Sequence, residues 1–382
     1  MKLIKKSRCL LAAALCMAAV VMLAGCAPAD PSDNQPDKPV IGSGEQVESP
    51  DDTPDASDAP SEADKDEPPA PRYINKLTGL ETTEELASIR PVAVMINNLY
   101  QATPQQGISR ADVMYEVLAE GGITRLLCLF TDYASLPETG SIRSSRDYFI
   151  DLSDAHDAIY VHCGGSPAAY ETLAARKTDN MDGITFNTPF YRNEWRKKNM
   201  GMEHSMMTTG ERLVKGISEK GYRTQSDAAQ PLSFQDTETP AANSGLTVTA
   251  TAAENITIEF SYYATSEFAY DKEAGVYLKS QFDAPHIDSN NDEQLYFENV
   301  ILLYAAQGAV PNDDKGRLYV NFIGEGDGLY AADGKVRNIK WSKQTRTSSY
   351  TLYEEDGVTE LLLHPGKTYI GIPPLGAETV IE

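Results

Sequence analysis

The sequence has few cysteines, and most of them lie near its N-terminus. Cys9, Cys16 and Cys26 fall within the first 26 residues, so only Cys128 and Cys163 remain for the rest of the 382-residue chain. No CxxC pair occurs, which argues against thiol redox chemistry. Both remaining cysteines lie in apolar, strand-like runs, and this favours two buried free thiols. The alternative is one disulfide between them, which an exported protein could form.

Histidine is also scarce. The five histidines are scattered along the chain and form neither an HExxH motif nor a close pair, as a zinc site of the common kinds would require. The segment Asp288–Glu293 has the acids of a calcium loop but lacks the glycine at its sixth position, so a solvated turn explains it better. The sequence therefore predicts no metal site and no cofactor.

Long hydrophobic runs are missing too. The apolar run over residues 9–23 follows four basic residues and is too short for a comfortable membrane-spanning helix, a layout typical of a secretory signal. It ends in Leu23-Ala24-Gly25-Cys26, which resembles the lipobox of bacterial lipoproteins. The resemblance implies that residues 1–25 are a signal peptide and that Cys26 carries a diacylglyceryl group, with acyl chains such as palmitate. An uncleaved anchor helix and a plain secretory signal are the alternatives.

Aromatic residues are absent from residues 27–71, which contain 13 Asp or Glu and two Lys. Such a segment cannot bury enough apolar surface to offset its chain entropy. Residues 26–71 are therefore predicted to be a lipidated cysteine followed by a disordered acidic linker, with a reach of about 35–40 Å. A phosphorylated or partner-binding tail is the alternative to a plain spacer.

Basic residues are outnumbered by acidic ones in the rest of the chain. From residue 72 onward there are 43 acids and 27 bases, a net charge of −16. Nucleic-acid binding needs a basic footprint, so we expect no nucleic-acid partner. Docking of this part on an anionic membrane surface is disfavoured for the same reason. A local basic pocket is still compatible with this balance.

Residues 72–224 predict a mixed α/β domain. Residues 179–205 predict a long irregular loop, of the kind that often carries function. The predicted strands are 91–97, 112–119, 124–131 and 158–163, and the predicted helices are 143–156, 166–177 and 209–221.

Residues 225–244 predict a connector, and residues 245–382 a β-rich domain. Short strands alternate with hairpin-type turns such as Asp333-Gly334 and Asp356-Gly357, a pattern typical of antiparallel sheets. The predicted fold class is therefore α+β. The predicted strands are 256–261, 268–270, 276–279, 300–305, 318–323, 336–341, 347–353 and 359–363.

Arg143 and Arg146 are the first candidate binding residues. At the start of the predicted helix 143–156 they would share one face, with Ser144 beside them. Helix starts attract anions, and arginine suits bidentate recognition of phosphate or carboxylate. Alternatively, both arginines pair with internal acids, for which the candidates are Glu116, Glu120 and Asp147.

The segment from His162 to Pro167 is the second candidate. Here a predicted strand passes through Gly164 and Gly165 into a helix, and open α/β sheets place ligands at such strand ends. Ser166 is not on a GxSxG elbow, so a helix cap is the better interpretation than a nucleophile.

Glu120 and Arg125 flank Gly121-Gly122, a pair that implies a tight turn or close backbone packing. Either charged residue could line a cleft. The alternative is that they pair with each other.

Many separate motifs, in order over about residues 80–375, resemble the YerB-like lipoproteins, a family whose two domains have no known function. The resemblance implies a two-part extracytoplasmic protein and supplies no mechanism. The family often has Asp where this chain has Asn97, Pro where it has Ser141 and Trp where it has Tyr369. The residues that carry the resemblance are 90–98, 107–113, 120–125, 142–144, 160–162, 164–167, 204–205, Tyr263, 285–288, 299–300, 341–343 and 365–368.

The leading hypothesis is a binding or accessory module of the cell envelope, held to the membrane through Cys26, whose ligand is an anionic or polar cell-wall fragment or an envelope protein. One alternative is a cell-wall hydrolase or transferase with His162 or His204 as base and Glu120 or Asp112 as its carboxylate partner. Another is a structural scaffold that adds a strand at a sheet edge. The predicted binding residues are Arg143, Ser144, Arg146, His162, Gly164, Gly165, Ser166, His204, Glu120 and Arg125.

Overall fold

The computed structural model describes residues 71–226, 228–236 and 249–382. The predicted signal peptide, Cys26 and the acidic linker up to residue 70 lie outside the described residues. The described residues belong to one compact unit. In the part of the chain that is described, no helix has the length and apolar character needed to cross a bilayer.

An 11-stranded sheet runs through both halves of the sequence. Its strand order is β11-β23-β22-β19-β25-β4-β5-β3-β7-β8, and β24 pairs with β23. The late strand β25 lies between β19 and β4 and is parallel to both. The bounds are β3 Val92–Asn97, β4 Val113–Leu118, β5 Thr124–Phe130, β7 Ile159–His162, β8 Asn180–Asp182, β11 Thr251–Ala252, β19 Asn299–Leu303, β22 Gly324–Ala332, β23 Lys335–Lys343, β24 Thr351–Glu354 and β25 Thr368–Ile372.

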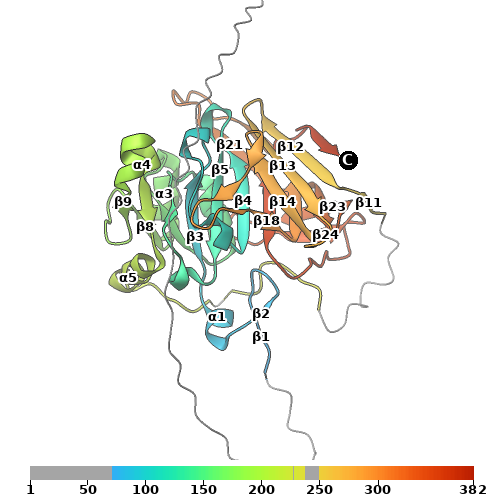
Figure 1. Ribbon diagram of the computed structural model, residues 1–382, viewed down its shortest axis with the longest axis horizontal. Helices are drawn as coiled ribbons and strands as arrows, with labels where there is room; N and C mark the ends of the chain where they lie inside the picture. The colour runs from blue at the N-terminus through green and yellow to red at the C-terminus, as the bar shows by residue number, and fades with distance from the viewer. Residues whose placement is uncertain (1–70, 227, 237–248) are drawn as a thin grey trace, which may run out of the picture. The chain divides into compact units, whose positions relative to one another are not determined.

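A second, six-stranded sheet packs on one face of the central sheet, and Figure 1 shows β12 and β13 beside β4 and β5. Strand β12 alternates exposed and buried residues, as expected for a sheet with one face in the core. Its order is β15-β14-β13-β12-β26, and β18 pairs with β14. The bounds are β12 Asn255–Ser261, β13 Ala264–Asp271, β14 Val276–Gln281, β15 Ala284–Pro285, β18 Tyr296–Phe297 and β26 Thr379–Ile381.

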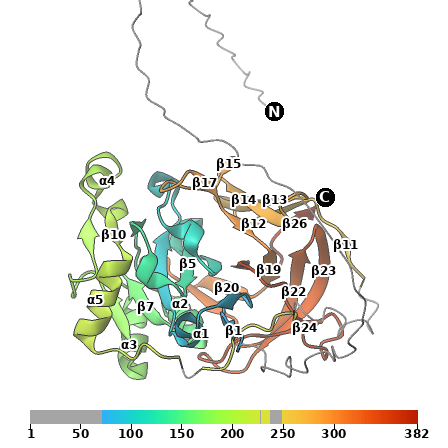
Figure 2. The same cartoon turned by 60° about the horizontal axis from the view of Figure 1, so that its bottom comes forward.

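Helices cover the central sheet around β3 and β7. Tyr148 and Leu152 of α2 and Leu173 of α3 belong to one buried cluster, whereas Leu213 and Ile217 of α5 belong to the cluster on the opposite face. Figure 2 shows these helices beside β5 and β7. The bounds are α1 Glu84–Ser88, α2 Asp147–Ala155, α3 Pro167–Arg176, α4 Glu194–Asn199 and α5 Gly210–Lys220.

Short ladders complete the described part. They are β1 Tyr73–Ile74 with β2 Glu81–Thr82, β6 Thr139–Gly140 with β10 Met206–Thr208 and β9 Tyr191–Arg192, β16 Ile287–Asp288 with β17 Glu293–Gln294, and β20 Ala306–Ala309 with β21 Leu318–Asn321.

The α+β class is confirmed, as are the four strands predicted in the first half and the helices at 166–177 and 209–221. Three expectations about elements were wrong. The predicted helix 143–156 begins only at Asp147. The predicted loop 179–205 contains β8, β9 and α4. Residues 359–363 form isolated bridges in place of a strand, while β22, β25 and β26 were missed. The domain boundaries 72–224, 225–244 and 245–382 stay a prediction.

Cys128 and Cys163 are both free thiols. Cys128 is fully buried in β5, and burial raises the pKa of its thiol. Cys163 is partly buried, and burial raises its pKa as well. A raised thiol pKa leaves little thiolate at neutral pH, so both cysteines are poor nucleophiles.

A buried polar cluster joins the two sheets. Glu116 on β4 and Lys279 on β14 are 1% and 0% exposed, and Lys279 Nζ lies 3.4 Å from Glu116 Oε2. The same carboxylate oxygen accepts hydrogen bonds from Ser266 (2.8 Å) and Tyr369 (2.9 Å). Its other oxygen accepts from Thr124 at 2.7 Å. Four other strands, β5, β13, β14 and β25, are therefore tied to one carboxylate on β4.

Asp288 holds a second contact between the halves. Its buried carboxylate accepts hydrogen bonds from the backbone N–H groups of Gly107 (3.0 Å), Ser109 (2.9 Å) and Asn290 (3.0 Å). The segment predicted to be a turn is therefore a turn whose first carboxylate fixes the loop before β4.

Candidate functional site

The predicted binding residues gather around residues 142–146, which we call the crossing segment. It runs extended past the carboxyl ends of β3 and β7. The N–H of Arg143 donates to Met95 O at 2.9 Å, and the N–H of Cys163 donates to Arg143 O at 3.1 Å. The N–H of Ser145 donates to Gly164 O at 2.9 Å. Because these bonds hold the segment extended, Arg143 and Arg146 do not share a helix face, and that part of the expectation was wrong.

On one side of the crossing segment, two arginines share one carboxylate. Arg146 forms an ion pair with Glu120, and Arg125 Nη2 lies 2.8 Å from Glu120 Oε1. Burial alone would raise the pKa of Glu120, but the charges of Arg125 and Arg146 lower it to about 2. Burial lowers the pKa of Arg125 to about 10, with a further contribution from the charge of Arg146. Arg146 thus pairs with an internal acid and Arg125 pairs with Glu120. These pairings are the alternatives predicted from the sequence for the two residues.

Arg143 differs from these two arginines. It is partly exposed, and it forms no ion pair with a carboxylate among the described residues. Its Nη1 donates to the backbone carbonyl of Glu203 at 3.3 Å, and its buried Nε has no hydrogen-bond partner in the described chain. A guanidinium with free N–H groups can still bind an anion through two parallel hydrogen bonds.

His204 lies beside Arg143. The amide nitrogen of Asn97 donates to His204 Nδ1 at 2.8 Å, and His204 Nε2 lies 3.3 Å from Glu203 Oε1. Burial lowers the pKa of His204; the charge of Glu203 opposes this shift, while those of Arg143 and Arg196 add to it. The imidazole is therefore neutral at pH 7.

His162 is enclosed on the other side of the crossing segment. Its side chain is fully buried and stacks on Tyr160, with ring centroids 5.1 Å apart. Its Nδ1–H donates to Gly164 O at 2.9 Å, and Nε2 lies 3.3 Å from Asn180 Oδ1. Both ring nitrogens of His162 therefore already have a partner within the protein.

The two histidines lie in separate environments. Among the described residues, the carboxylate within 4 Å of His162 is that of Asp182, at 3.9 Å, and the one within 4 Å of His204 is that of Glu203. Neither is Glu120 or Asp112, the partners expected from the sequence. The arrangement proposed for a hydrolase is therefore not the one observed.

Gly164, Gly165 and Ser166 position the backbone of the site. Gly164 has a φ of +77°, a conformation that favours glycine, and a Cβ there would lie 3.4 Å from Ser144 Oγ. Ser166 caps α3, because its hydroxyl accepts from the N–H of Ala169 at 3.1 Å. The hydroxyl of Ser144 donates to Cys163 O at 2.9 Å. Ser166 is thus a helix cap, as predicted, and its place among the binding residues stays a prediction.

Sequence reasoning did not select Asn97, Asp182 and Glu203, although all three contact predicted site residues. Asp182 accepts from the N–H of Gly164 at 2.7 Å and from the hydroxyl of Tyr170 at 2.9 Å. Its only sequence signal is its place at the carboxyl end of β8. Glu203 carried no signal, because its contact with His204 depends on the turn after α4.

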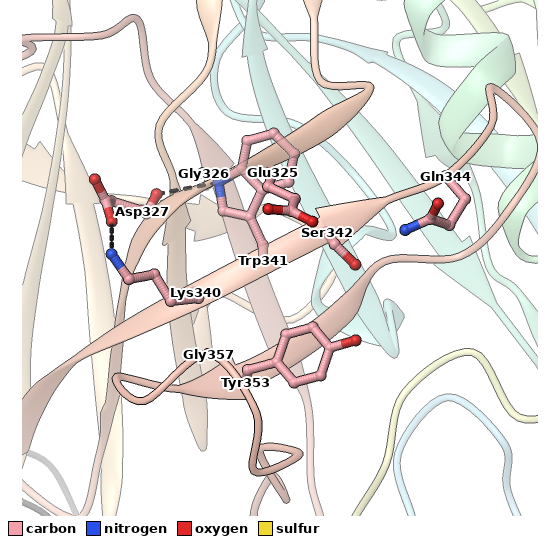
Figure 3. Close-up of a pocket in the computed structure, with 9 residues that line it drawn as sticks. All are labelled: Glu325, Gly326, Asp327, Lys340, Trp341, Ser342, Gln344, Tyr353 and Gly357. Atoms are coloured by element: carbon pink, nitrogen blue, oxygen red, sulfur yellow. Dashed lines mark hydrogen bonds and ion pairs between the residues drawn. The ribbon is translucent and has the colours of Figure 1, made fainter.

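A separate pocket of about 450 Å³ lies on β22, β23 and β24. Figure 3 shows Trp341 and Tyr353 with the Asp327–Lys340 ion pair, and the Trp341 indole N–H donates to Asp327 O at 3.1 Å. Trp341 is 3% exposed, because its ring covers Gly326, where a Cβ would lie 2.5 Å from the indole. Little of the indole surface is therefore left for a ligand to stack on.

Comparison with known proteins places the chain among relatives without an assigned activity. Residues 77–223 and 256–370 match the N-terminal and C-terminal domains of a family described as protein of unknown function (DUF3048). The chain is 33% identical over 299 residues to a Bacillus subtilis protein named "Putative lipoprotein YerB", covering 78% of this chain and 85% of that protein. A crystal structure of YerB from Bacillus subtilis matches with a TM-score of 0.70 and 29% identity, over 81% of this chain and 100% of that one.

Proposed function

This chain belongs to the DUF3048 family of YerB-like proteins, and we propose that it is a lipid-anchored extracytoplasmic binding protein that takes an anionic envelope ligand at Arg143. The anchor is supported by the name of its Bacillus subtilis relative and by the sequence Leu23-Ala24-Gly25-Cys26 behind a basic, apolar N-terminus. With the lipid on Cys26, the domain faces away from the cytoplasm, on the outer side of the cytoplasmic membrane in a host with one membrane.

The state of Arg143 is the observation that carries the binding proposal. In a unit of net charge −16, the guanidinium of Arg143 is partly exposed and has no carboxylate partner among the described residues. Arg212 shares this state, but Arg143 lies close enough to Arg125 for their charges to interact. Arg125 and Arg146 leave one more positive charge than Glu120 cancels. This local excess favours a phosphate or carboxylate on the ligand.

The first prediction concerns anion binding. Arg143→Gln is expected to weaken binding of N-acetylglucosamine 1-phosphate by about 10- to 100-fold, since hydrogen bonds to charged groups contribute about 1.5–3 kcal/mol. Isothermal titration calorimetry on the full-length protein in detergent, at low ionic strength, measures the change.

Arg212→Gln is the matched control. Arg212 is also exposed and also hydrogen-bonds only to backbone carbonyls, those of Thr188 and Phe190, so its loss should leave the affinity unchanged. Equal affinity of Arg143→Gln and wild type for the phosphorylated sugar would remove Arg143 from the site.

The second prediction concerns the anchor. Cys26→Ala is expected to move the protein from the membrane fraction to the aqueous fraction in a detergent phase-separation experiment. Each buried CH₂ of an acyl chain contributes about 0.8 kcal/mol, and two chains make anchoring stable. Cys16→Ala is the control, because that residue precedes the predicted cleavage point. A Cys26→Ala protein that stays with the membrane would contradict lipid anchoring.

A further inference from the structure

A pocket of about 310 Å³ lies at the seam between the two halves of the described chain. We call it the seam pocket. Its walls come from the loop after β3 (Tyr100), the turn between β4 and β5, the β12–β13 hairpin (Tyr263) and the β14–β15 turn (Phe282). The hairpin is fixed to the turn, because the Ser261 hydroxyl hydrogen-bonds to Gly122 O. The pocket therefore exists only where both halves meet.

Aromatic rings form the open walls of the seam pocket. Tyr100 is 64% exposed and Tyr263 is 67% exposed. The rings of Tyr100 and Phe282 meet edge to face, with centroids 5.5 Å apart and planes at 83°. Tyr262, 93% exposed, meets Tyr263 in the same way. Exposed aromatic rings gathered at a concave site are typical of ligand binding.

The polar groups of the seam pocket are all uncharged. Its described lining contains no Asp, Glu, Lys or Arg, although the unit as a whole is strongly acidic. Asn98 and Thr124 at its base use their hydrogen bonds within the chain, to Glu116 and to each other. The hydroxyls of Tyr100 and Tyr263 and the amide of Gln101 have no hydrogen-bond partner among the described residues. The base of the pocket is thus fixed by hydrogen bonds within the protein, whereas the side chains at its rim offer uncharged donors and acceptors to a ligand.

Phe282 is held in an unfavourable backbone conformation. It and Asp283 form the two-residue loop between β14 and β15, with φ values of +55° and +58°. Such loops prefer Asn-Gly or Gly, and a bulky aromatic residue in the left-handed region is strained. Strain of this kind is often found at ligand-binding and active sites, where the surrounding structure holds it in place. The turn places the Phe282 ring against Tyr100.

We infer that the seam pocket binds an uncharged sugar ring of a saccharide chain. A pyranose has apolar C–H faces that pack on aromatic rings and a rim of hydroxyls that matches the free tyrosine and glutamine groups. A cavity of this size lies at the small end of ligand pockets, which suits one ring of a longer chain. The inference does not depend on the anion site at Arg143.

The test is calorimetric titration of the full-length protein with neutral trisaccharides. The probes are triacetylchitotriose, cellotriose and maltotriose, and the detergent is an amine oxide without a sugar headgroup, which could compete. At least one probe should bind with a Kd of about 0.1–1 mM, and Tyr100→Ala or Tyr263→Ala should weaken it at least about 10-fold, a loss of about 1.4 kcal/mol. Tyr319→Ala removes a tyrosine 48% exposed on β21 and should leave binding unchanged.

Phe282→Asn separates binding from folding. Asparagine accepts the left-handed conformation, so the Tm should not fall, while saccharide affinity should drop at least about 10-fold. Failure of all three trisaccharides to bind at 10 mM would overturn the inference, as would full affinity in Tyr100→Ala or Phe282→Asn. Binding of a peptide in place of every saccharide would also overturn it. Arg143→Gln should keep wild-type saccharide affinity, so the two proposals fail separately.

Discussion

Replacing Glu116 by alanine is expected to lower the free energy of unfolding by about 3–5 kcal/mol, because it leaves the Lys279 ammonium buried without a counter-charge. Lys279 is fully buried, and burial lowers its pKa while the charge of Glu116 opposes the shift. The variant also removes the acceptor used by Asn98, Thr124 and the other donors to this carboxylate. Urea unfolding followed by fluorescence measures the loss.

The reverse variant, Lys279→Met, should cost less. Glu116 would keep four neutral hydrogen-bond donors, Asn98, Thr124, Ser266 and Tyr369. The double variant should be less destabilised than the sum of the two single variants, because the buried charges are removed together. Glu254→Ala breaks the exposed ion pair with Lys272 and should change stability little. Additive effects of Glu116→Ala and Lys279→Met would show that the two charges do not stabilise each other.

Stability is expected to fall steeply as the pH drops from about 6.5 toward 3, through buried histidines. Burial, aided by the charge of Lys343, lowers the pKa of His156 to about 3, and burial lowers that of His286 well below its usual value. Between these pH values each of the two histidines is protonated in the unfolded chain but stays neutral in the folded chain. Each such group therefore removes up to about 1.4 kcal/mol of stability per pH unit.

His156→Gln tests the contribution of one of these histidines. In the wild type, His156 Nε2 lies 2.7 Å from the Tyr115 hydroxyl, and Nδ1 has no partner among the described residues. Glutamine is neutral throughout, so the free energy of unfolding of the variant should fall about 1.4 kcal/mol less per pH unit between pH 6 and 4. The slope of the free energy of unfolding against pH separates the two effects of the substitution. A loss of packing lowers this free energy by the same amount at every pH and leaves the slope unchanged. Parallel wild-type and variant curves would contradict a neutral buried His156.

Local signals in the sequence were enough for part of the fold. Ser166-Pro167 and Thr209 with Gly221 mark helix ends that depend on nearby residues alone. The apolar runs at β3, β4, β5 and β7 likewise indicate strands without reference to their neighbours. These predictions succeeded because the physical causes lie within a few residues.

Other features depend on contacts between distant residues. The periodicity of Tyr148, Phe149 and Leu152 identified α2 but not its start, because Arg143 is held extended by Met95 and Cys163. Strand β25 contains Gly371 and precedes Pro373-Pro374, so its local composition does not indicate a central strand.

The candidate site shows the same limit. The sequence placed Gly164 at the end of a strand, but it placed Ser144 and Arg146 at the start of a helix, so it did not predict that Gly164 O bonds to the N–H of Ser145. The contact of His204 with Asn97 joins residues 107 positions apart, and no pattern in the chain predicts it.

The position of β25 has a consequence for biogenesis. This strand comes from residues 368–372, yet it fills the gap between β4 and β19. Until it arrives, both neighbours are open sheet edges, and the contacts that close them span most of the chain. A chain made from its N-terminus cannot complete this sheet before residues 368–372 are available. Chains truncated before residue 368 are therefore expected to leave β4 and β19 unpaired at these edges and to be more open to proteolysis than the full chain.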